Sequence, residues 1–430
     1  MQLSAIAQIL RSAKNADLRM TRYWLTVGAQ PNHYDVIRKF AHESRPGASD
    51  FFRRTPMTRS RLLLVATITA SFVVAAAAFR ISSTSASTSA TSAAGSLSPA
   101  TPMLEPRSGH SATLLPDGKV LIAGGMRRNQ DFYKSAELYD PATGKFQPTG
   151  EMHERRVGNI AVLLPSGKVL VAGGWVGMGG TDSAELYDPA TGKFTVIAKM
   201  TIPRGRPSAT LLANGDVLIA GGEVRDNEPV ASAEIFHGKS LSFERTGAMH
   251  HARVSHTATL LADGRVLIAG GYDHDPESGA ELYDPKSGAF TETGSLSTPR
   301  CKHTAGLLPD GRVLIAGGSN SRGWNGNLNS AEIYDPHTGK FTAASSMNDS
   351  RFKLPDEAVQ LLSGKLLIAG GSKEVEVYDP ATGKFLVASG QMNEPWHYVS
   401  ETRLRDGRVL LTGGYPDGDQ ATAQTWIYRP

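Results

Sequence analysis

The chain has 430 residues, of which 20% are charged, 40% are hydrophobic, 45 are Gly and 24 are Pro, a composition that favours a folded all-β protein with many turns. Residues 1–60 hold ten Lys/Arg and four Asp/Glu, so the remainder is nearly neutral with 35 basic and 37 acidic groups, which argues against nucleic-acid binding by the main body. Cys301 is the single cysteine, which excludes an intrachain disulfide and a cysteine-based zinc site.

The N-terminal part is predicted to direct export. Residues 1–56 form a basic extension, which lies outside the mature protein if the next segment is cleaved. Within residues 57–80, the uncharged stretch from Leu62 to Phe79 fits either a secretory signal starting at Met57 or a single transmembrane anchor. Basic residues precede this stretch, so both interpretations place everything after Arg80 outside the cytoplasm: secreted, periplasmic, or anchored by one helix. Residues 81–100, rich in Ser, Thr and Ala, are predicted to be a flexible linker.

Residues 101–430 repeat one pattern seven times. In the first unit, two apolar strands flank the turn Pro116-Asp117-Gly118-Lys119, and two further strands flank the turn that begins at Asp140-Pro141. An apolar strand ends in a Gly-Gly pair in every unit, at Gly124-Gly125, Gly173-Gly174, Gly221-Gly222, Gly270-Gly271, Gly317-Gly318, Gly370-Gly371 and Gly413-Gly414. Seven four-stranded units of this kind predict a seven-bladed β-propeller.

The repeat pattern is similar to that of a known family. A Gly-Gly pair after an apolar strand, an upstream Arg and a downstream Tyr, at a period near 50 residues, resembles the kelch repeat, which is shared with the propeller of galactose oxidase. The resemblance covers about 330 of the 430 residues and is closest to a bacterial exported type. It implies binding on the propeller face that carries the loops of variable length.

The ends of the chain are predicted to close the ring together. A Met or Leu precedes each repeat Arg by four residues, and Met103 occupies this position before the first repeat, whereas the last repeat stops after its third strand at Tyr428. We therefore expect the segment from Leu97 to Met103 to supply the fourth strand of the seventh blade, with the apolar residue inside that strand.

An arginine recurs once per repeat and has two interpretations. These residues could form a ring that binds an anionic ligand, as kelch domains can, or each could form a structural ion pair with a glutamate of the third strand. The seventh repeat has Trp396 at the Arg position and Trp426 at the Glu position, and this joint loss favours the ion pair. The arginines are Arg107, Arg156, Arg204, Arg253, Arg300 and Arg351, and the glutamates are Glu137, Glu185, Glu234, Glu281, Glu332 and Glu376.

Positions that differ between repeats are better candidates for binding a ligand. The third residue after the repeat Arg is one such position, and loop aromatic residues are expected near it. The predicted binding residues are His110, Asn159, Trp175, His256, Tyr272, His303, Trp324, Asp356, Trp396, His397 and Tyr398.

The sequence favours binding over catalysis. Galactose oxidase holds copper with two His and two Tyr, one of them linked to a Cys; Cys301 stands at a similar place, but the following repeat has Ser350-Arg351-Phe352-Lys353 where that Tyr should be. No metal or cofactor is predicted, and a copper oxidase is the least favoured function. We expect a recognition module for a protein or glycan partner, with no nucleic acid and with membrane contact only through an uncleaved segment from Leu62 to Phe79. The alternative is a periplasmic sugar-converting enzyme, epimerase- or mutarotase-like, that uses Asp356 or Glu357.

Overall fold

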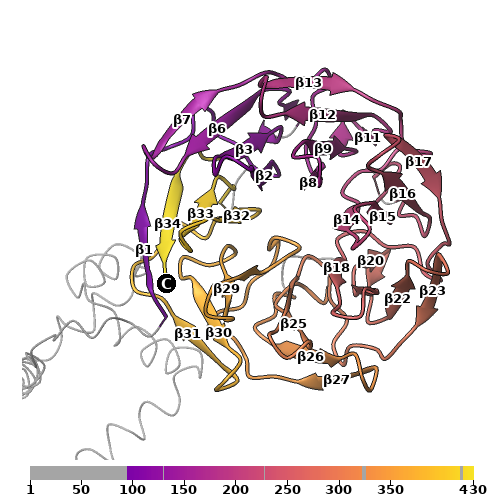
Figure 1. Cartoon of the computed structure of the whole chain (residues 1–430). Coiled ribbons are helices and arrows are strands. Elements are labelled where there is room, and N and C mark those ends of the chain that lie inside the picture. The colour runs from indigo at the N-terminus through magenta and orange to yellow at the C-terminus, as the bar shows by residue number, and fades with distance from the viewer. Residues whose placement is uncertain (1–93, 129, 227, 322–325, 417–419) are drawn as a thin grey trace, which may run out of the picture. The chain divides into compact units, whose positions relative to one another are not determined.

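The computed structural model describes residues 94–430 except residues 129, 227, 322–325 and 417–419, and the predicted segments within residues 1–93 lie outside this part. The described residues form seven four-stranded antiparallel sheets around a central axis (Figure 1) and three two-stranded hairpins. The all-β, seven-bladed propeller that the repeats predicted is therefore confirmed. Among the described residues, no helix has the length and apolar character needed to cross a membrane.

Each blade has strands a to d in order from the axis to the rim. Blade 1 consists of β2 (Ser111–Leu114), β3 (Val120–Ala123), β6 (Ala136–Asp140) and β7 (Lys145–Pro148). Blade 2 consists of β8 (Ile160–Leu163), β9 (Val169–Ala172), β12 (Ala184–Asp188) and β13 (Lys193–Val196). Blade 3 consists of β14 (Ser208–Leu211), β15 (Val217–Ala220), β16 (Ala233–His237) and β17 (Ser242–Arg245). Blade 4 consists of β18 (Thr257–Leu260), β19 (Val266–Ala269), β22 (Ala280–Asp284) and β23 (Ala289–Glu292). Blade 5 consists of β24 (Thr304–Leu307), β25 (Val313–Ala316), β26 (Ala331–Asp335) and β27 (Lys340–Ala343). Blade 6 consists of β28 (Val359–Gln360), β29 (Leu366–Ile368), β30 (Glu376–Asp379) and β31 (Lys384–Val387). Blade 7 consists of β32 (Ser400–Arg403), β33 (Val409–Thr412), β34 (Thr425–Arg429) and, as strand d, β1 (Ser96–Pro99).

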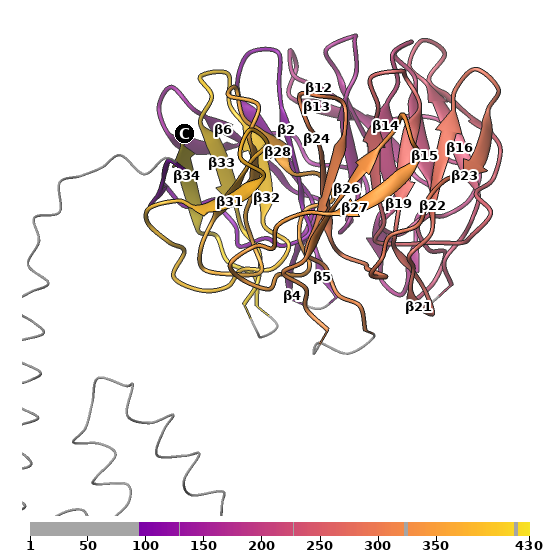
Figure 2. The same ribbon diagram turned by 90° about the horizontal axis from the view of Figure 1, so that it is seen from below.

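The two faces of the propeller carry different connections. The short a–b and c–d turns lie on one face, called the turn face, and the longer b–c and d–a connections lie on the other, called the loop face (Figure 2). Three b–c loops on the loop face form hairpins: β4 (Met126–Arg128) with β5 (Asp131–Phe132), β10 (Trp175–Val176) with β11 (Gly179–Gly180), and β20 (Tyr272–Asp273) with β21 (Asp275–Pro276). The repeated turns set the strand registers, since Gly118 takes a φ of 89° that other residues rarely adopt.

Adjacent blades pack through their apolar side chains. Strand b is buried throughout, as in Val120 to Ala123 at 0–1% exposure, because each sheet has a neighbour on both sides. The strand c tyrosine and the strand d phenylalanine of a blade contact each other, as do Tyr187 and Phe194 with ring centroids 4.9 Å apart. The Tyr187 hydroxyl lies 2.8 Å from Thr149 Oγ1 of blade 1, so this repeat element also joins neighbouring blades.

The N-terminal strand closes the ring as the sequence predicted. β1 pairs antiparallel with β34, with Leu97 opposite Tyr428, and Leu97 also donates a 2.7 Å backbone hydrogen bond to Ser389 of blade 6. Two details of the prediction were wrong. The part of the linker from Ala94 to Ala100 belongs to the propeller, and Met103 lies just after the strand, where it is buried between blades 7 and 1. The equivalent residues of the other blades, such as Met152, also follow strand d and fill the space beneath the loop face.

Candidate functional site

The repeat arginines are buried in ion pairs. Each is 0–1% exposed and binds the predicted strand c glutamate at 2.7–3.0 Å, as Arg204 Nε does with Glu234 Oε1 at 2.7 Å. The same guanidinium donates to the carbonyl oxygen of the first residue of the Gly-Gly pair, at 2.7 Å from Arg204 to Gly221. These arginines cannot reach a ligand at the surface, so the anion-binding alternative for them was wrong.

Blade 7 replaces the ion pair with two tryptophans. Trp396 and Trp426 are 6% and 2% exposed, and their ring centroids lie 6.2 Å apart. An indole pair fills the space between strand c and the d–a connection without burying charge. Trp396 therefore packs in the core, and its prediction as a binding residue was wrong.

The histidines of the predicted binding patch are also buried. His110, His256 and His303 are 6%, 1% and 0% exposed. The Nε2 atom of each lies 2.8–3.0 Å from a hydroxyl of the preceding blade: Thr412, Ser208 and Thr257. Burial lowers the pKa of His110 and of His256 to about 3 and that of His303 well below its ordinary value, so the rings stay neutral. These residues connect neighbouring blades.

His397, Tyr272 and Trp324 do not join a common site in the described part. His397 is 3% exposed and packs its ring against Phe352 and Tyr415, with centroids 4.9 and 5.8 Å away. Tyr272 is half-buried at the start of the β20–β21 hairpin, and it bridges to Val254 of its own blade. Trp324 lies outside the described residues.

The second residue after the repeat Arg faces the propeller axis. The sequence analysis had chosen the third residue after this Arg as a binding position. In all seven blades it has a positive φ of 49–62°, in the left-handed region that favours glycine. We call these residues the axial ring: Gly109, Gly158, Arg206, Ser255, Lys302, Lys353 and Tyr398. Neighbouring members join through the backbone, for example Gly158 N–H to Gly109 O at 2.8 Å and Tyr398 N–H to Lys353 O at 2.9 Å. The sequence analysis missed this ring, although the ring residues differ from blade to blade in size and charge, which was the signal used to choose binding positions.

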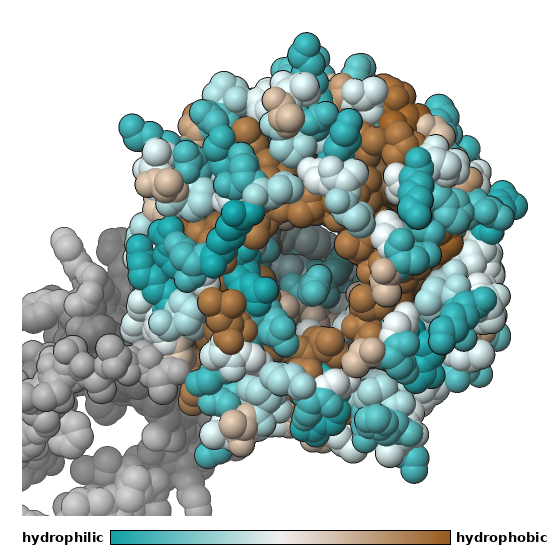
Figure 3. All heavy atoms as spheres, in the orientation of Figure 1, coloured by the Kyte–Doolittle hydropathy of each residue, from teal (hydrophilic) through white to brown (hydrophobic). Residues whose placement is uncertain are grey.

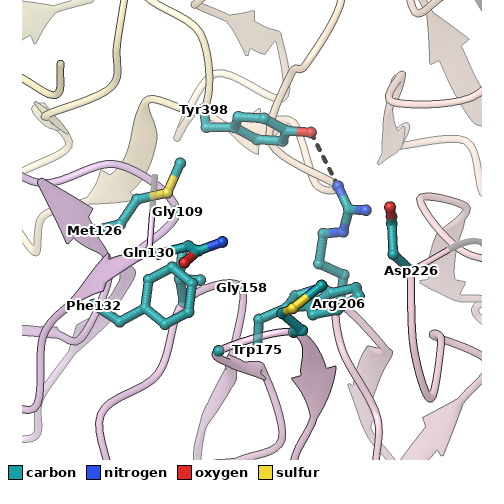
Figure 4. Close-up of a pocket in the computed structure, with 12 residues that line it drawn as sticks. Gly109, Met126, Gln130, Phe132, Gly158, Trp175, Arg206, Asp226 and Tyr398 are labelled. Atoms are coloured by element: carbon teal, nitrogen blue, oxygen red, sulfur yellow. Dashed lines mark hydrogen bonds between the residues drawn. The ribbon is translucent and has the colours of Figure 1, made fainter. Parts of the chain in front are cut away.

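A cavity of about 400 Å³, the vestibule, opens on the loop face above the axial ring (Figure 4). It lies over the two ring positions that are glycine, Gly109 and Gly158. A Cβ atom at Gly158 would come within 2.8 Å of Cγ of Arg206, so glycine there leaves room for the arginine. The wall comes from the β4–β5 and β10–β11 hairpins and the blade 3 loop, and the other lining residues are Met126, Gln130, Phe132, Val157, Trp175, Gly177, Met178, Arg206, Asp226 and Tyr398.

Trp175 and Arg206 are both held in place by close contacts in the vestibule. The Trp175 indole lies against Gly205, where a Cβ atom would be 2.5 Å from Nε1, so only glycine lets the indole take this position. Arg206 donates to Glu223 at 2.6 Å and to the Tyr398 hydroxyl at 3.5 Å, and Figure 4 shows the Tyr398 hydroxyl pointing across the vestibule to this guanidinium. The vestibule thus combines an aromatic wall with a fixed cation.

A second cavity of about 340 Å³, the chamber, lies below the ring on the axis. The space-filling view shows a hollow at the centre of the blades with apolar residues around it (Figure 3). Gly109, Gly158, Arg206 and Tyr398 line both cavities, so the vestibule and the chamber are adjacent. The chamber is also lined by strand a alanines and by Asn159, Lys302, Asp356, Glu357 and Glu401.

The carboxyl groups of the chamber have raised pKa values. Asp356 and Glu357 remain accessible from the chamber but are surrounded by protein, and this poor hydration raises the pKa of Asp356 to about 6 and also raises that of Glu357. Glu401 is more enclosed, and burial raises its pKa to about 8. Of the predicted binding residues, the structure therefore brings Trp175 and Tyr398 to the vestibule, and His110, Asn159, Asp356 and Tyr398 to the chamber.

Comparison with known proteins identifies the repeat. The kelch motif matches residues 106–153, 157–201 and 300–348. The described residues form a seven-bladed propeller, and three segments of it match the kelch motif. A solved structure of similar fold is a fungal alcohol oxidase of the AA5 family in complex with copper, at 17% sequence identity and a TM-score of 0.64, covering 79% of this chain and 76% of that one. A search of curated proteins found no match.

The likeness to the copper oxidase extends to the fold alone, and the residues of this kelch propeller do not fit a copper ion. In the described part of the chain, no three His, Cys, Asp or Glu side chains gather as a metal site would require. The buried histidines are directed to hydroxyls of neighbouring blades. Cys301 is 4% exposed, and burial raises the pKa of its thiol, as for a small packing residue.

Proposed function

We propose that this kelch propeller is a recognition module that binds a carbohydrate or a protein segment in the vestibule. The fold supports recognition or scaffolding in general. The observation that carries the proposal is the vestibule itself, a concave site with mostly apolar walls and a few oriented polar groups, on the face with variable loops. The Trp175 indole offers a flat surface for a sugar ring or an apolar side chain, and Arg206, Asp226 and Gln130 offer hydrogen bonds.

Labelled protein on a glycan array and on a displayed peptide library tests this function. We expect binding to one of the two, and a loss of at least tenfold in affinity for Trp175→Ala. Leu362→Ala is the matched control, because Leu362 is an equally apolar, 71% exposed residue in an a–b turn on the turn face. Binding that Trp175→Ala leaves unchanged would show that the vestibule is not the site.

A sugar-converting enzyme is the second candidate. It is favoured by Asp356, whose pKa of about 6 suits proton transfer near neutral pH and whose carboxyl faces a cavity next to the vestibule. Anomerisation of candidate sugars, followed by nuclear magnetic resonance, tests it. Turnover that disappears in Asp356→Asn or Glu357→Gln would establish catalysis, and no turnover beyond the spontaneous rate would leave the binding function alone.

We also propose that the propeller acts outside the cytoplasm, on the basis of the apolar stretch from Leu62 to Phe79. Cell fractionation, with mass spectrometry of the N-terminus of the extracted protein, tests this. A new N-terminus shortly after residue 77 indicates a cleaved signal, and an intact chain in the membrane fraction indicates an anchor. An intact chain in the cytoplasm would contradict export.

A further inference from the structure

The chamber contains charged side chains that have no ionic partner. Lys302, Asp356, Glu357 and Glu401 line it, and within the described part of the chain none of them forms an ion pair. Arg206, which also lines the chamber, pairs with Glu223, but its Nε atom is buried and has no hydrogen-bond partner there. Groups of both signs thus line one small cavity, in which Asp356 and Glu357 are exposed and Lys302 and Glu401 are half-buried.

These charges are specific to their blades and are not required by the repeat. Glu401 stands at the second position of strand a, opposite Leu411, where blades 1 to 5 have Ala112, Ala161, Ala209, Ala258 and Ala305. Lys302 occupies an axial-ring position, where blades 1 and 2 have glycine and blade 4 has Ser255 in the same backbone conformation. The scaffold therefore accepts a small residue at both places.

Asp356 and Glu357 reach the chamber through an irregularity of blade 6. The segment from Arg351 to Leu361 is two residues longer than its counterpart from Arg107 to Leu115. The extra length lets the chain pair in parallel with β24 of blade 5, where Ala305 N–H donates to Asp356 O at 3.2 Å and Ala358 N–H donates to Ala305 O at 2.8 Å. Pairing with the neighbouring blade fixes both carboxyl groups at the axis.

Glu401 completes this acidic side of the chamber. Its Oε1 accepts the Ala369 N–H at 2.9 Å, whereas Oε2 is buried and has no hydrogen-bond partner in the described part. A buried carboxyl oxygen without a donor is unfavourable, and burial raises the pKa of Glu401 despite the Ala369 N–H and the charge of Arg351.

We propose that the chamber binds a small zwitterion, in which an ammonium group and a carboxylate are joined by a short chain as in α-, β- and γ-amino acids. Asp356, Glu357 and Glu401 receive the ammonium group, and Lys302 receives the carboxylate. A ligand with only one charge leaves the groups of the other sign unpaired and binds more weakly. This site goes beyond the proposed function and does not depend on it, because Lys302 and Glu401 line the chamber and not the vestibule.

Isothermal titration calorimetry at pH 8.5, where Glu401 is ionised and the probes are still zwitterions, tests the proposal on the full chain with glycine, β-alanine and γ-aminobutyrate. Propionate and propylamine, which carry one charge each, are the comparison ligands. We expect at least one zwitterion to bind, and to bind at least tenfold more tightly than either comparison ligand. Three probes with different charge separations are needed because the spacing of the two charged sides selects among them.

Two variants that imitate other blades test the residues. Glu401→Ala and Lys302→Ser restore residues that the equivalent positions already hold, so both are expected to fold, and each should weaken the zwitterion at least tenfold. Glu292→Ala and Lys145→Ser, which remove exposed charges of the outer strands, are the matched controls and should leave binding unchanged. Trp175→Ala should also leave it unchanged, which separates this site from the proposed vestibule function.

Three results would overturn the proposal. The first is that no zwitterion gives a heat of binding, even at concentrations 10-fold above those at which the comparison ligands give none. The second is that propylamine binds as tightly as the best zwitterion. The third is that Lys302→Ser leaves the affinity for the zwitterion unchanged. If Glu401→Ala lowers the thermal midpoint strongly, Lys302→Ser alone decides the matter, since Ser255 shows that serine is accommodated in the ring.

Discussion

The Trp175 indole of blade 2 lies against the backbone of Gly205 in blade 3, so closely that a Cβ atom on Gly205 would come within 2.5 Å of Nε1. Gly205 follows the buried Arg204 directly, and the same position carries Ser, Val, Cys, Phe or His in the other blades. The wall of the vestibule in one blade therefore depends on a missing side chain in the next.

Gly205→Ala is expected to displace the Trp175 indole and to lower the free energy of unfolding by roughly 1–3 kcal/mol through overpacking. The displaced indole becomes more exposed, so tryptophan fluorescence should shift to longer wavelength. The shift should be absent when Gly205→Ala is combined with Trp175→Phe. An equal shift in both backgrounds would mean that another tryptophan responds.

The axial ring predicts opposite effects for two reciprocal substitutions. Gly158→Ala places a Cβ atom at a φ of 62° and 2.8 Å from Arg206 Cγ, and is expected to cost about 1–3 kcal/mol. Ser255→Gly relieves the same backbone conformation at a φ of 56°, and is expected to be neutral or stabilising by up to about 1 kcal/mol. Urea denaturation measures both, and destabilisation by Ser255→Gly would contradict the strain at this ring.

The buried ion pairs predict strong coupling between Arg204 and Glu234, both 0% exposed. Arg204→Met leaves a buried carboxylate without its cation and is expected to cost roughly 3–5 kcal/mol. Replacing Glu234 by Met as well should recover part of that loss, as the Trp396 and Trp426 pair does naturally in blade 7. Denaturation of the two single variants and the double variant measures the coupling, and additive losses would argue against it.

Glu401 predicts a pH dependence of stability. Its pKa is raised from 4.5 to about 8 by burial, so between these values the folded protein holds a proton that the unfolded chain releases. Stability therefore falls as the pH rises through this window, and Glu401→Gln removes the fall. From pH 5 to pH 8, the thermal midpoint of the variant should gain roughly 2–4 °C relative to the natural chain. If the thermal midpoints of the natural chain and of Glu401→Gln change with pH in parallel, Glu401 is well hydrated and its pKa is not raised.

The closing strand predicts a sharp limit to N-terminal truncation. A chain that starts at Ala94 keeps β1 and its bonds to β34 and Ser389, and is expected to unfold at the same temperature as the full chain. A chain that starts at Thr101 exposes the edge of β34 and should lose cooperativity or aggregate. Circular dichroism and gel filtration compare the two, and equal stability would mean that β1 contributes little to closure.

The sequence by itself determined the architecture of this protein. The Gly-Gly pairs and the turns such as Pro116-Asp117-Gly118 act locally, so their seven recurrences were enough to predict seven blades. The joint loss of the Arg and Glu at Trp396 and Trp426 was enough to predict the ion pairs. In these cases the partners occupy fixed places in each repeat, and a comparison of repeats reveals them.

The tertiary structure decided where the cavities lie. The left-handed backbone of the d–a connection turns the axial ring to the axis and the neighbouring histidines between blades, and a sequence pattern does not show which of two adjacent residues will point inward. The vestibule exists because Gly109, Gly158 and Gly205 of three blades lack side chains at one place. The chamber has acidic groups because two extra residues in blade 6 pair with blade 5. A cavity is formed by side chains from several blades, so it depends on their arrangement in space and cannot be seen within a single repeat.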